Sequence, residues 1–324
     1  MTFSRRTVMQ MLVGATAGVA SLGMPRAALA TSGAAGQPAG IYRFRLGEAK
    51  VTALLDGHIA IAPELVVGMD PARADQTLMA AGYPKGFQGL QIPVNGYLVE
   101  MNGRKTLIDA GAAATMGPGG GGLLPALAAL GVTPAEIDEV LLTHLHLDHV
   151  AGVVDGSGAA MFPNAELVVA QSEWDFWHDE AVFASVPEEN RGFFHIARNS
   201  VAPYADRMRF FTGEEEVSNG ILSVPMPGHT PGHAGFQLNS GDDSLLIWGD
   251  LIHMTTLQMA HPEWTVVFDG DPALTVESRK RFLDRAAADN LLVAGMHLDF
   301  PGLGRVQRAG EAYHFQQAPW QALL

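Results

Sequence analysis

One short run, THLHLDH at residues 143–149, restricts this chain more than any other feature. It follows the apolar run 140–142, which predicts that it lies just past the C-terminal end of a buried strand. In an extended turn His144 and His146 point to the same side. The aspartate and histidine that end the run come one turn later, where they can reach a second ion. Neutral imidazoles and a carboxylate bind zinc or a similar first-row metal, so the run predicts a metal site.

Three later segments place a histidine or an acid at the same kind of position, after an apolar run. They are PGHTPGH at 227–233, which contains His229 and His233, Gly249-Asp250, and Gly295-Met296-His297. Loops that each leave a buried strand are expected to converge on one rim of a sheet, where binding residues gather. We expect His229, Asp250 and His297 to lie close to the first run in the folded chain. His233 is expected to hydrogen-bond a ligand rather than to bind metal itself.

The composition excludes several classes of protein. The chain has no cysteine, which rules out disulfides, thiolate zinc sites, iron–sulfur clusters and a cysteine nucleophile. Its 324 residues carry 20 Lys and Arg against 34 Asp and Glu, for a formal net charge of −14. No basic run is present, so we expect no nucleic-acid partner. With 48% apolar and 17% charged residues, the chain is expected to be globular.

The first thirty residues have the composition of an export signal. Arg5-Arg6 precedes a weakly apolar run at 8–24, and Ala28-Leu29-Ala30 offers a small-x-small cleavage site. The arginine pair is typical of a twin-arginine signal, and a general secretory signal or an uncleaved anchor remain as alternatives. Residues 31–40 are expected to form a flexible linker. We therefore predict a periplasmic or secreted protein that, once cleaved, has no membrane association.

The rest of the chain reads as one α/β domain over residues 41–324. Strand-like and helix-like runs alternate, and Asn102-Gly103 between two apolar runs indicates a hairpin. Thr133-Pro134 reads as the start of a helix, and the run 272–288 is an amphipathic helix. Since hairpins occur beside alternating strands and helices, the sheet should be mixed.

The four segments together resemble the metallo-β-lactamase superfamily, through H-x-H-x-D-H, G-H-T-P-G-H, G-D and the late lone histidine. The resemblance implies an αββα sandwich of two mixed β-sheets flanked by helices, with a dinuclear metal site at one edge. It implies two divalent ions, zinc in the first place, with cobalt, manganese or iron as alternatives. The implied ligands are His144, His146 and His229 for one ion, Asp148, His149 and His297 for the other, and Asp250 as a bridge. Asp148 and Asp250 would be the catalytic carboxylates, Asp148 by orienting the nucleophile or taking its proton.

Within that superfamily the residues favour hydrolysis. A histidine at position 146 differs from flavodiiron-type members, which have Glu there, and Asp250 differs from true β-lactamases. The segments 46–57, 94–100, 175–177, 192–194, 249–252 and 297–306 resemble the methyl parathion hydrolase and aryl-lactonase branch. This implies an exported homodimeric hydrolase that opens lactones or aryl esters of the dihydrocoumarin type by attack of a metal-bridging hydroxide. Organophosphate triesters and acyl homoserine lactones are alternative substrates, and a non-catalytic or metal-storage relative is the alternative class.

The same resemblance suggests the walls of a substrate pocket. A small apolar or aromatic ester or lactone needs an apolar cavity beside the metals. Trp177, Phe193 and Phe194 match aromatic wall positions of that branch. Three further candidates rest on the sequence itself: Met116 in a glycine-rich loop, Phe268, and His253, which three residues after Asp250 can face the pocket and hydrogen-bond a leaving oxygen. Ordinary core packing is the alternative for each of them.

Overall fold

The computed structural model describes residues 40–86 and 88–322, which belong to one compact unit. The predicted export signal, and the predicted linker up to its last residue, lie outside the described residues. Among the residues described, no helix is long and apolar enough to cross a membrane.

Two seven-stranded sheets form the centre of the domain. The first has the strand order β1-β2-β4-β5-β6-β7-β8, and the second β16-β15-β14-β12-β11-β10-β9. The strands of the first sheet are β1 Ile41–Leu46, β2 Ala49–Ile61, β4 Leu90–Met101, β5 Arg104–Ile108, β6 Glu139–Leu141, β7 Glu166–Ala170 and β8 Met208–Phe211. Those of the second are β9 Glu216–Ser218, β10 Ile221–Pro225, β11 Ala234–Ser240, β12 Asp243–Ile247, β14 Leu292–Ala294, β15 Leu303–Ala309 and β16 Ala312–Gln317. A separate two-stranded ribbon pairs β3 Val66–Val67 with β13 Thr265–Val266.

Both large sheets are mixed, as the sequence predicts. In the first sheet β1, β2, β4 and β5 pair antiparallel, whereas β5 to β8 run parallel. In the second sheet only β12 and β14 pair in parallel. The β4–β5 hairpin turns at Asn102 and Gly103, whose φ angles of 52° and 77° are those that the residue pair accommodates well.

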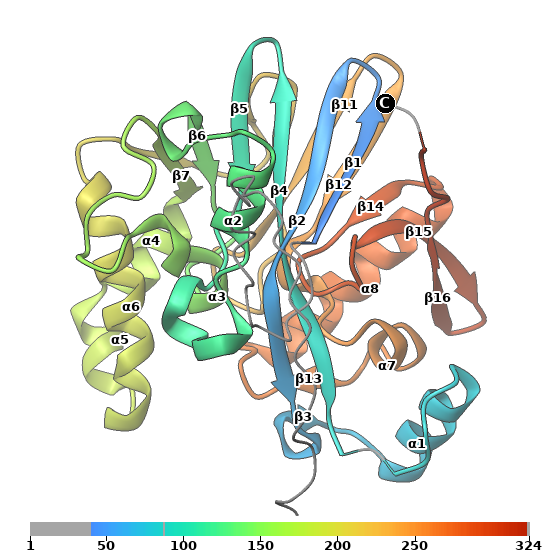
Figure 1. Ribbon diagram of the computed structural model, residues 1–324. Coiled ribbons are helices and arrows are strands. Elements are labelled where there is room, and N and C mark those ends of the chain that lie inside the picture. Colours follow the sequence, from blue (N-terminus) through green and yellow to red (C-terminus); the bar gives the residue numbers. More distant parts are fainter. Residues whose placement is uncertain (1–39, 87, 323–324) are drawn as a thin grey trace, which may run out of the picture. The chain divides into compact units, whose positions relative to one another are not determined.

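Helices cover the outer face of each sheet (Figure 1). The described helices are α1 Pro71–Ala80, α2 Leu123–Ala129, α3 Leu147–Val150, α4 Gln171–His178, α5 Glu180–Ser185, α6 Arg191–Val201, α7 Thr255–Ala260 and α8 Pro272–Ala288. Helices α2, α4 and α6 pack on the first sheet and α8 on the second, whereas α1 packs with α7 at the β3–β13 ribbon. Side chains alternate along the strands accordingly: Tyr97 and Val99 point between the sheets, whereas Leu98 packs under the helices of the first sheet. The architecture is the predicted αββα sandwich.

Some elements differ from the sequence prediction. The helix expected after Thr133 is a single 3₁₀ turn, Pro134–Glu136. The Glu136 carboxylate closes this turn by accepting the Thr133 N–H at 2.8 Å. Strand β6 begins at Glu139, so the chain has no room for a longer helix. The β15–β16 hairpin and the helices α1 and α5 to α7 were not predicted.

Backbone hydrogen bonds join the two sheets at one edge. The N–H of Ala234 donates to the carbonyl of Thr143 at 3.0 Å, and the N–H of Asn95 donates to the carbonyl of Met296 at 2.8 Å. The side-chain amide of Asn95 also donates to the carbonyl of Leu298 at 2.9 Å. These bonds hold together the loops that carry the histidines.

Candidate metal centre

The loops after β6, β10, β12 and β14 meet at this joined edge. His146 is still extended, with φ −69° and ψ 155°, and α3 begins directly after it. This change from extended chain to a single helical turn separates the first two histidines of the run from Asp148 and His149. The two pairs therefore face different parts of one buried cluster.

A first group consists of His144, His146, His229 and Asp250, whose ligand atoms lie within 4.8 Å of one another. Nδ1 of His146 lies 3.0 Å from Nε2 of His144 and 2.9 Å from Nε2 of His229. Oδ2 of Asp250 lies 3.2 Å from Nε2 of His229. Three imidazole nitrogens that converge on one point leave several lone pairs facing each other, which a cation between them would satisfy.

A second group consists of Asp148, His149, His297 and again Asp250. Oδ2 of Asp148 lies 3.4 Å from Nε2 of both histidines. Oδ1 of Asp250 lies 3.1 Å from Nε2 of His149 and 3.3 Å from Nε2 of His297. Asp250 thus turns one carboxylate oxygen toward each group, which is the geometry of a bridging ligand.

Outer contacts orient the histidine rings. Nδ1 of His149 donates to Asp109 at 2.7 Å, Nδ1 of His229 donates to Asp269 at 2.8 Å, and Nδ1 of His297 donates to the carbonyl of Pro93 at 2.7 Å. Each bond points Nε2 into the cluster and fixes the ring tautomer. Asp109 and Asp269 were not predicted; an acid directly after the apolar β5 was the available signal for Asp109, and Asp269 had none.

The electrostatics of the cluster differ between its histidines. Burial lowers the pKa of His146 to about 3, and the neighbouring His229 adds to this effect. Burial also lowers the pKa of His229, but the hydrogen bonds to Asp250 and Asp269 outweigh it and raise that pKa to about 9. At His297, burial is outweighed by Asp250 and Asp148, which raise its pKa to about 10. Without a metal, the neighbouring carboxylates therefore keep His229 and His297 protonated.

The residues fit a dinuclear divalent site. Within the described part of the chain, Nε2 of His149, Nε2 of His297 and Oδ1 of Asp250 are buried and make no hydrogen bond. Buried polar atoms are rarely left in this state unless an ion or a water satisfies them. Nitrogen and carboxylate donors in two groups of four match the preference of zinc and related ions for about four ligands.

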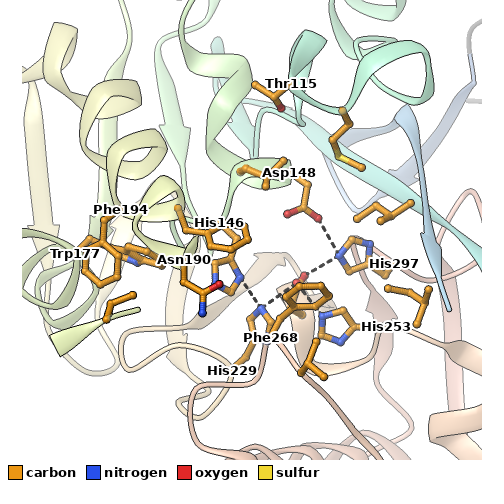
Figure 2. Close-up of a pocket in the computed structure, with 18 residues that line it drawn as sticks. Thr115, His146, Asp148, Trp177, Asn190, Phe194, His229, His253, Phe268 and His297 are labelled. Atoms are coloured by element: carbon orange, nitrogen blue, oxygen red, sulfur yellow. Dashed lines mark hydrogen bonds and ion pairs between the residues drawn. The ribbon is translucent and has the colours of Figure 1, made fainter. Parts of the chain in front are cut away.

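An apolar cavity of about 570 Å³ opens onto both groups. In Figure 2, Trp177 and Phe194 lie beside His146, whereas His253 lies beside His297 across the cavity. All six predicted wall residues line it; so do Ile59, Ile61, Thr115, Leu147, Val186, Asn190 and Val267, which were not predicted. Among the residues described, neither Lys nor Arg lines this cavity.

His233 and His253 lie next to the groups without belonging to either. The backbone N–H of Asp250 donates to Nε2 of His233, as expected of a residue that supports a ligand. Nε2 of His253 lies 3.2 Å from Oδ2 of Asp250, and its ring stacks on His297 with centroids 5.2 Å apart.

Comparison with known proteins agrees with this geometry. Residues 90–297 match the family model of the metallo-beta-lactamase superfamily, and the chain belongs to that superfamily. It is 32% identical to the hydrolase AbOPH of the beta-lactamase superfamily, with a TM-score of 0.83 over 88% of this chain and 100% of that one. It is 25% identical to AidC, a dizinc quorum-quenching lactonase, with a TM-score of 0.82 over 87% and 99% of the two chains.

Among curated proteins, the N-acyl homoserine lactonase AttM of Rhizobium radiobacter is 29% identical over 167 residues. The match covers 44% of this chain and 58% of AttM. The chain thus matches little more than half the length of this curated relative.

Proposed function

We propose that the chain is a dinuclear metal-dependent hydrolase that opens lactones or aryl esters. One observation carries the proposal: the two ligand groups, joined by Asp250, form the floor of an apolar cavity. Two divalent ions in such a site supply an activated water at neutral pH and stabilise the negative charge that develops during hydrolysis.

The chain's own residues supply the remaining parts. Asp148 is 9% exposed and lines the cavity. Burial raises its pKa, but His149 and His297 outweigh burial and hold the pKa well below the usual value, so the group is a carboxylate at neutral pH. As an acceptor at the cavity floor it can orient a nucleophilic water and take its proton.

The cavity favours an uncharged substrate with an apolar part. Its walls combine Trp177, Phe193 and Phe268 with aliphatic side chains, and in the part of the chain that is described they bring no lysine or arginine to pair with a phosphate monoester or a free carboxylate. Aryl lactones, aryl esters, acyl homoserine lactones and phosphotriesters all share this neutrality. The likeness to AttM and AidC supports a lactone as the scissile group.

The test compares kcat/KM for an aryl lactone, an acyl homoserine lactone and an aryl phosphotriester, using protein loaded with metal and a chelated control. We expect the aryl lactone to exceed the phosphotriester by more than about tenfold, or about 1.4 kcal/mol of transition-state binding. A phosphotriester preference of that size would assign the chain to phosphotriester hydrolysis instead. Equal rates with and without the chelator would overturn the metal-dependent mechanism.

Export belongs to the same proposal. Its support is Arg5-Arg6, the apolar run 8–24 and Ala28-Leu29-Ala30. Intact mass of protein recovered from a periplasmic fraction should correspond to a chain that begins near Thr31; a full-length chain retained in the cytoplasm would contradict it.

A further inference from the structure

Glu173 on α4 connects the two loops that supply the histidines of the first group. Its side chain is fully buried and accepts four hydrogen bonds. Oε1 accepts from the N–H of Leu145 at 3.0 Å and from the indole of Trp177 at 2.6 Å. Oε2 accepts from the hydroxyl of Thr230 at 2.6 Å and from the N–H of Gly232 at 3.0 Å.

Two of these donors are adjacent in sequence to histidines of the first group. Leu145 lies between His144 and His146, and Thr230 directly follows His229. One carboxylate therefore sets the separation of the H-x-H loop from the G-H-T-P-G-H loop. The approach is close, because a Cβ on Gly232 would lie 2.1 Å from the backbone nitrogen of Glu173.

His146 depends on this connection more than the other histidines do. His149, His229 and His297 are each oriented by an acceptor at Nδ1. His146 turns Nδ1 into the cluster, and among the described residues its Nε2 has no hydrogen-bond partner. Its ring packs instead against the edge of Trp177, at 5.6 Å between centroids. Glu173 holds this indole and also the backbone next to His146.

The second group has separate support. Asp109 holds His149 and the carbonyl of Pro93 holds His297, and neither contact involves Glu173. We propose that Glu173 is a positioning residue that sets the affinity of the first metal position, formed by His144, His146 and His229, while leaving the second position unchanged. The inference rests on the proposed metal site, but its test does not depend on the reaction.

The test measures each position alone. In a His297→Ala background only the first group keeps all its ligands, and in a His146→Ala background only the second does. Zinc and cobalt(II) dissociation constants are measured for E173Q in both backgrounds. A glutamine places an NH₂ group against two of the four donors, so one of the two loops loses its hydrogen bonds to residue 173.

We expect metal binding at the first position to weaken about 10- to 100-fold, as for other groups that support metal ligands, with a changed cobalt(II) visible spectrum. Binding at the second position should change less than about threefold by the same measure.

Two further variants keep the test decisive. T230V removes one donor and leaves Glu173 in place, so it should weaken the first position in the same direction even where E173Q folds poorly. E139Q is the matched control, because Glu139 is also buried but pairs with Arg104 at the start of β6. Equal weakening of both positions by E173Q, no weakening of either, or the same effect from E139Q would each overturn the inference. If the metal binds as expected but no ester or lactone is cleaved, the proposed function fails and the role of Glu173 stands.

Discussion

The backbone N–H of Asp250 donates a hydrogen bond of 2.9 Å to Nε2 of His233. Nδ1 of His233 in turn donates to the carbonyl of Met226 at 2.8 Å, which fixes the ring tautomer. Gly249, next to Asp250, has φ +52°, and a Cβ there would lie 2.5 Å from the same Nε2 atom. His233 and Gly249 together set the turn from which the shared carboxylate projects.

Replacement of His233 by phenylalanine should loosen the turn at Asp250, because it removes the hydrogen-bond acceptor but keeps an aromatic ring. The buried N–H of Asp250 loses its acceptor, at about 1–3 kcal/mol, and affinity for both ions should fall by about 10- to 100-fold. Metal content after dialysis and a denaturation curve measure the two effects. His314→Phe, on the exposed side of β16, is the control; a variant of His233 with full metal content would contradict the support role.

Loss of Asp250 should differ from loss of His146. Asp250→Ala removes a ligand from both groups, so the chain should lose both ions, whereas His146→Ala should keep one. Turnover should fall by more than about 100-fold in both variants, because a ligand matters more than the residues that support it. Metal per chain after gel filtration separates the two cases, with the exposed His195→Ala as control. Near-normal turnover in either variant would refute the hydrolytic site.

Metal binding should release protons. In the metal-free cluster the carboxylates raise the pKa of His229 to about 9 and of His297 to about 10. Both rings are therefore protonated on both nitrogens and positively charged at pH 7. A ligand nitrogen must lose this proton. Metal affinity should therefore rise with pH from 7 toward 10. Titration calorimetry in two buffers of different ionisation enthalpy measures the release at pH 7, and identical heats in both buffers would contradict it.

The same shifts predict how the metal-free protein responds to pH. A histidine whose pKa is raised above its unfolded value of about 6.5 adds stability that is complete below that pH and is lost as pH rises through the folded pKa. His229 and His297 should therefore contribute less above pH 9 to 10. The thermal midpoint of chelated protein, compared between pH 7 and pH 10, should fall more than that of His229→Ala in the same buffers. An equal fall in the two proteins would show that His229 makes no such contribution.

Phe268 should affect substrate binding more than stability. Its side chain is 41% exposed at the cavity rim, so a substrate can cover it further. Phe268→Ala should lower kcat/KM for an aryl lactone by about tenfold, close to the lower end for burial of a phenyl group. The unfolding free energy should change by less than about 1 kcal/mol, because exposed side chains contribute little. Phe210→Ala, 37% exposed on β8 and outside the cavity, is the matched control.

Asp56 should keep the glycine-rich loop at residues 112–123, which carries Met116, in one conformation. Its buried carboxylate accepts the N–H groups of Ala112 at 2.9 Å, Gly121 at 3.2 Å and Leu123 at 3.0 Å. Asp56→Asn places an NH₂ group against these donors, so residues 112–123 should exchange amide hydrogen faster and KM should rise more than kcat falls. Asp155→Asn, which disturbs an exposed turn, is the control. Unchanged exchange in the loop would contradict the anchoring role.

The seven clustered residues were predictable because their signals are local, whereas the αββα sandwich followed from the resemblance of the four segments to the superfamily. His144, His146, Asp148 and His149 fall within six residues after one apolar strand, and the other three each follow an apolar run. The helix Pro272–Ala288 was predicted with the bounds that the structure has, since it has a clear amphipathic pattern.

The supporting residues were not predictable for the opposite reason. Glu173 is one acid in a helix, and its role depends on loops 28 and 57 residues away. Asp269 is one acid in a loop, and only the folded chain brings it to His229, 40 residues earlier. Periodicity reports which face of an element is buried, but it does not report which distant backbone groups meet there.

The joined edge of the two sheets has a consequence for how long the folded protein persists. His144 and His149 follow a strand of one sheet, while His229 and His297 follow strands of the other, so an ion in either group would cross-link both halves of the sandwich. The halves could then separate only by releasing ions, and at a free metal concentration 100 times the dissociation constant each ion would oppose unfolding by about 2.7 kcal/mol. The surrounding metal supply would thus govern the survival of the chain against proteolysis, and not only its chemistry.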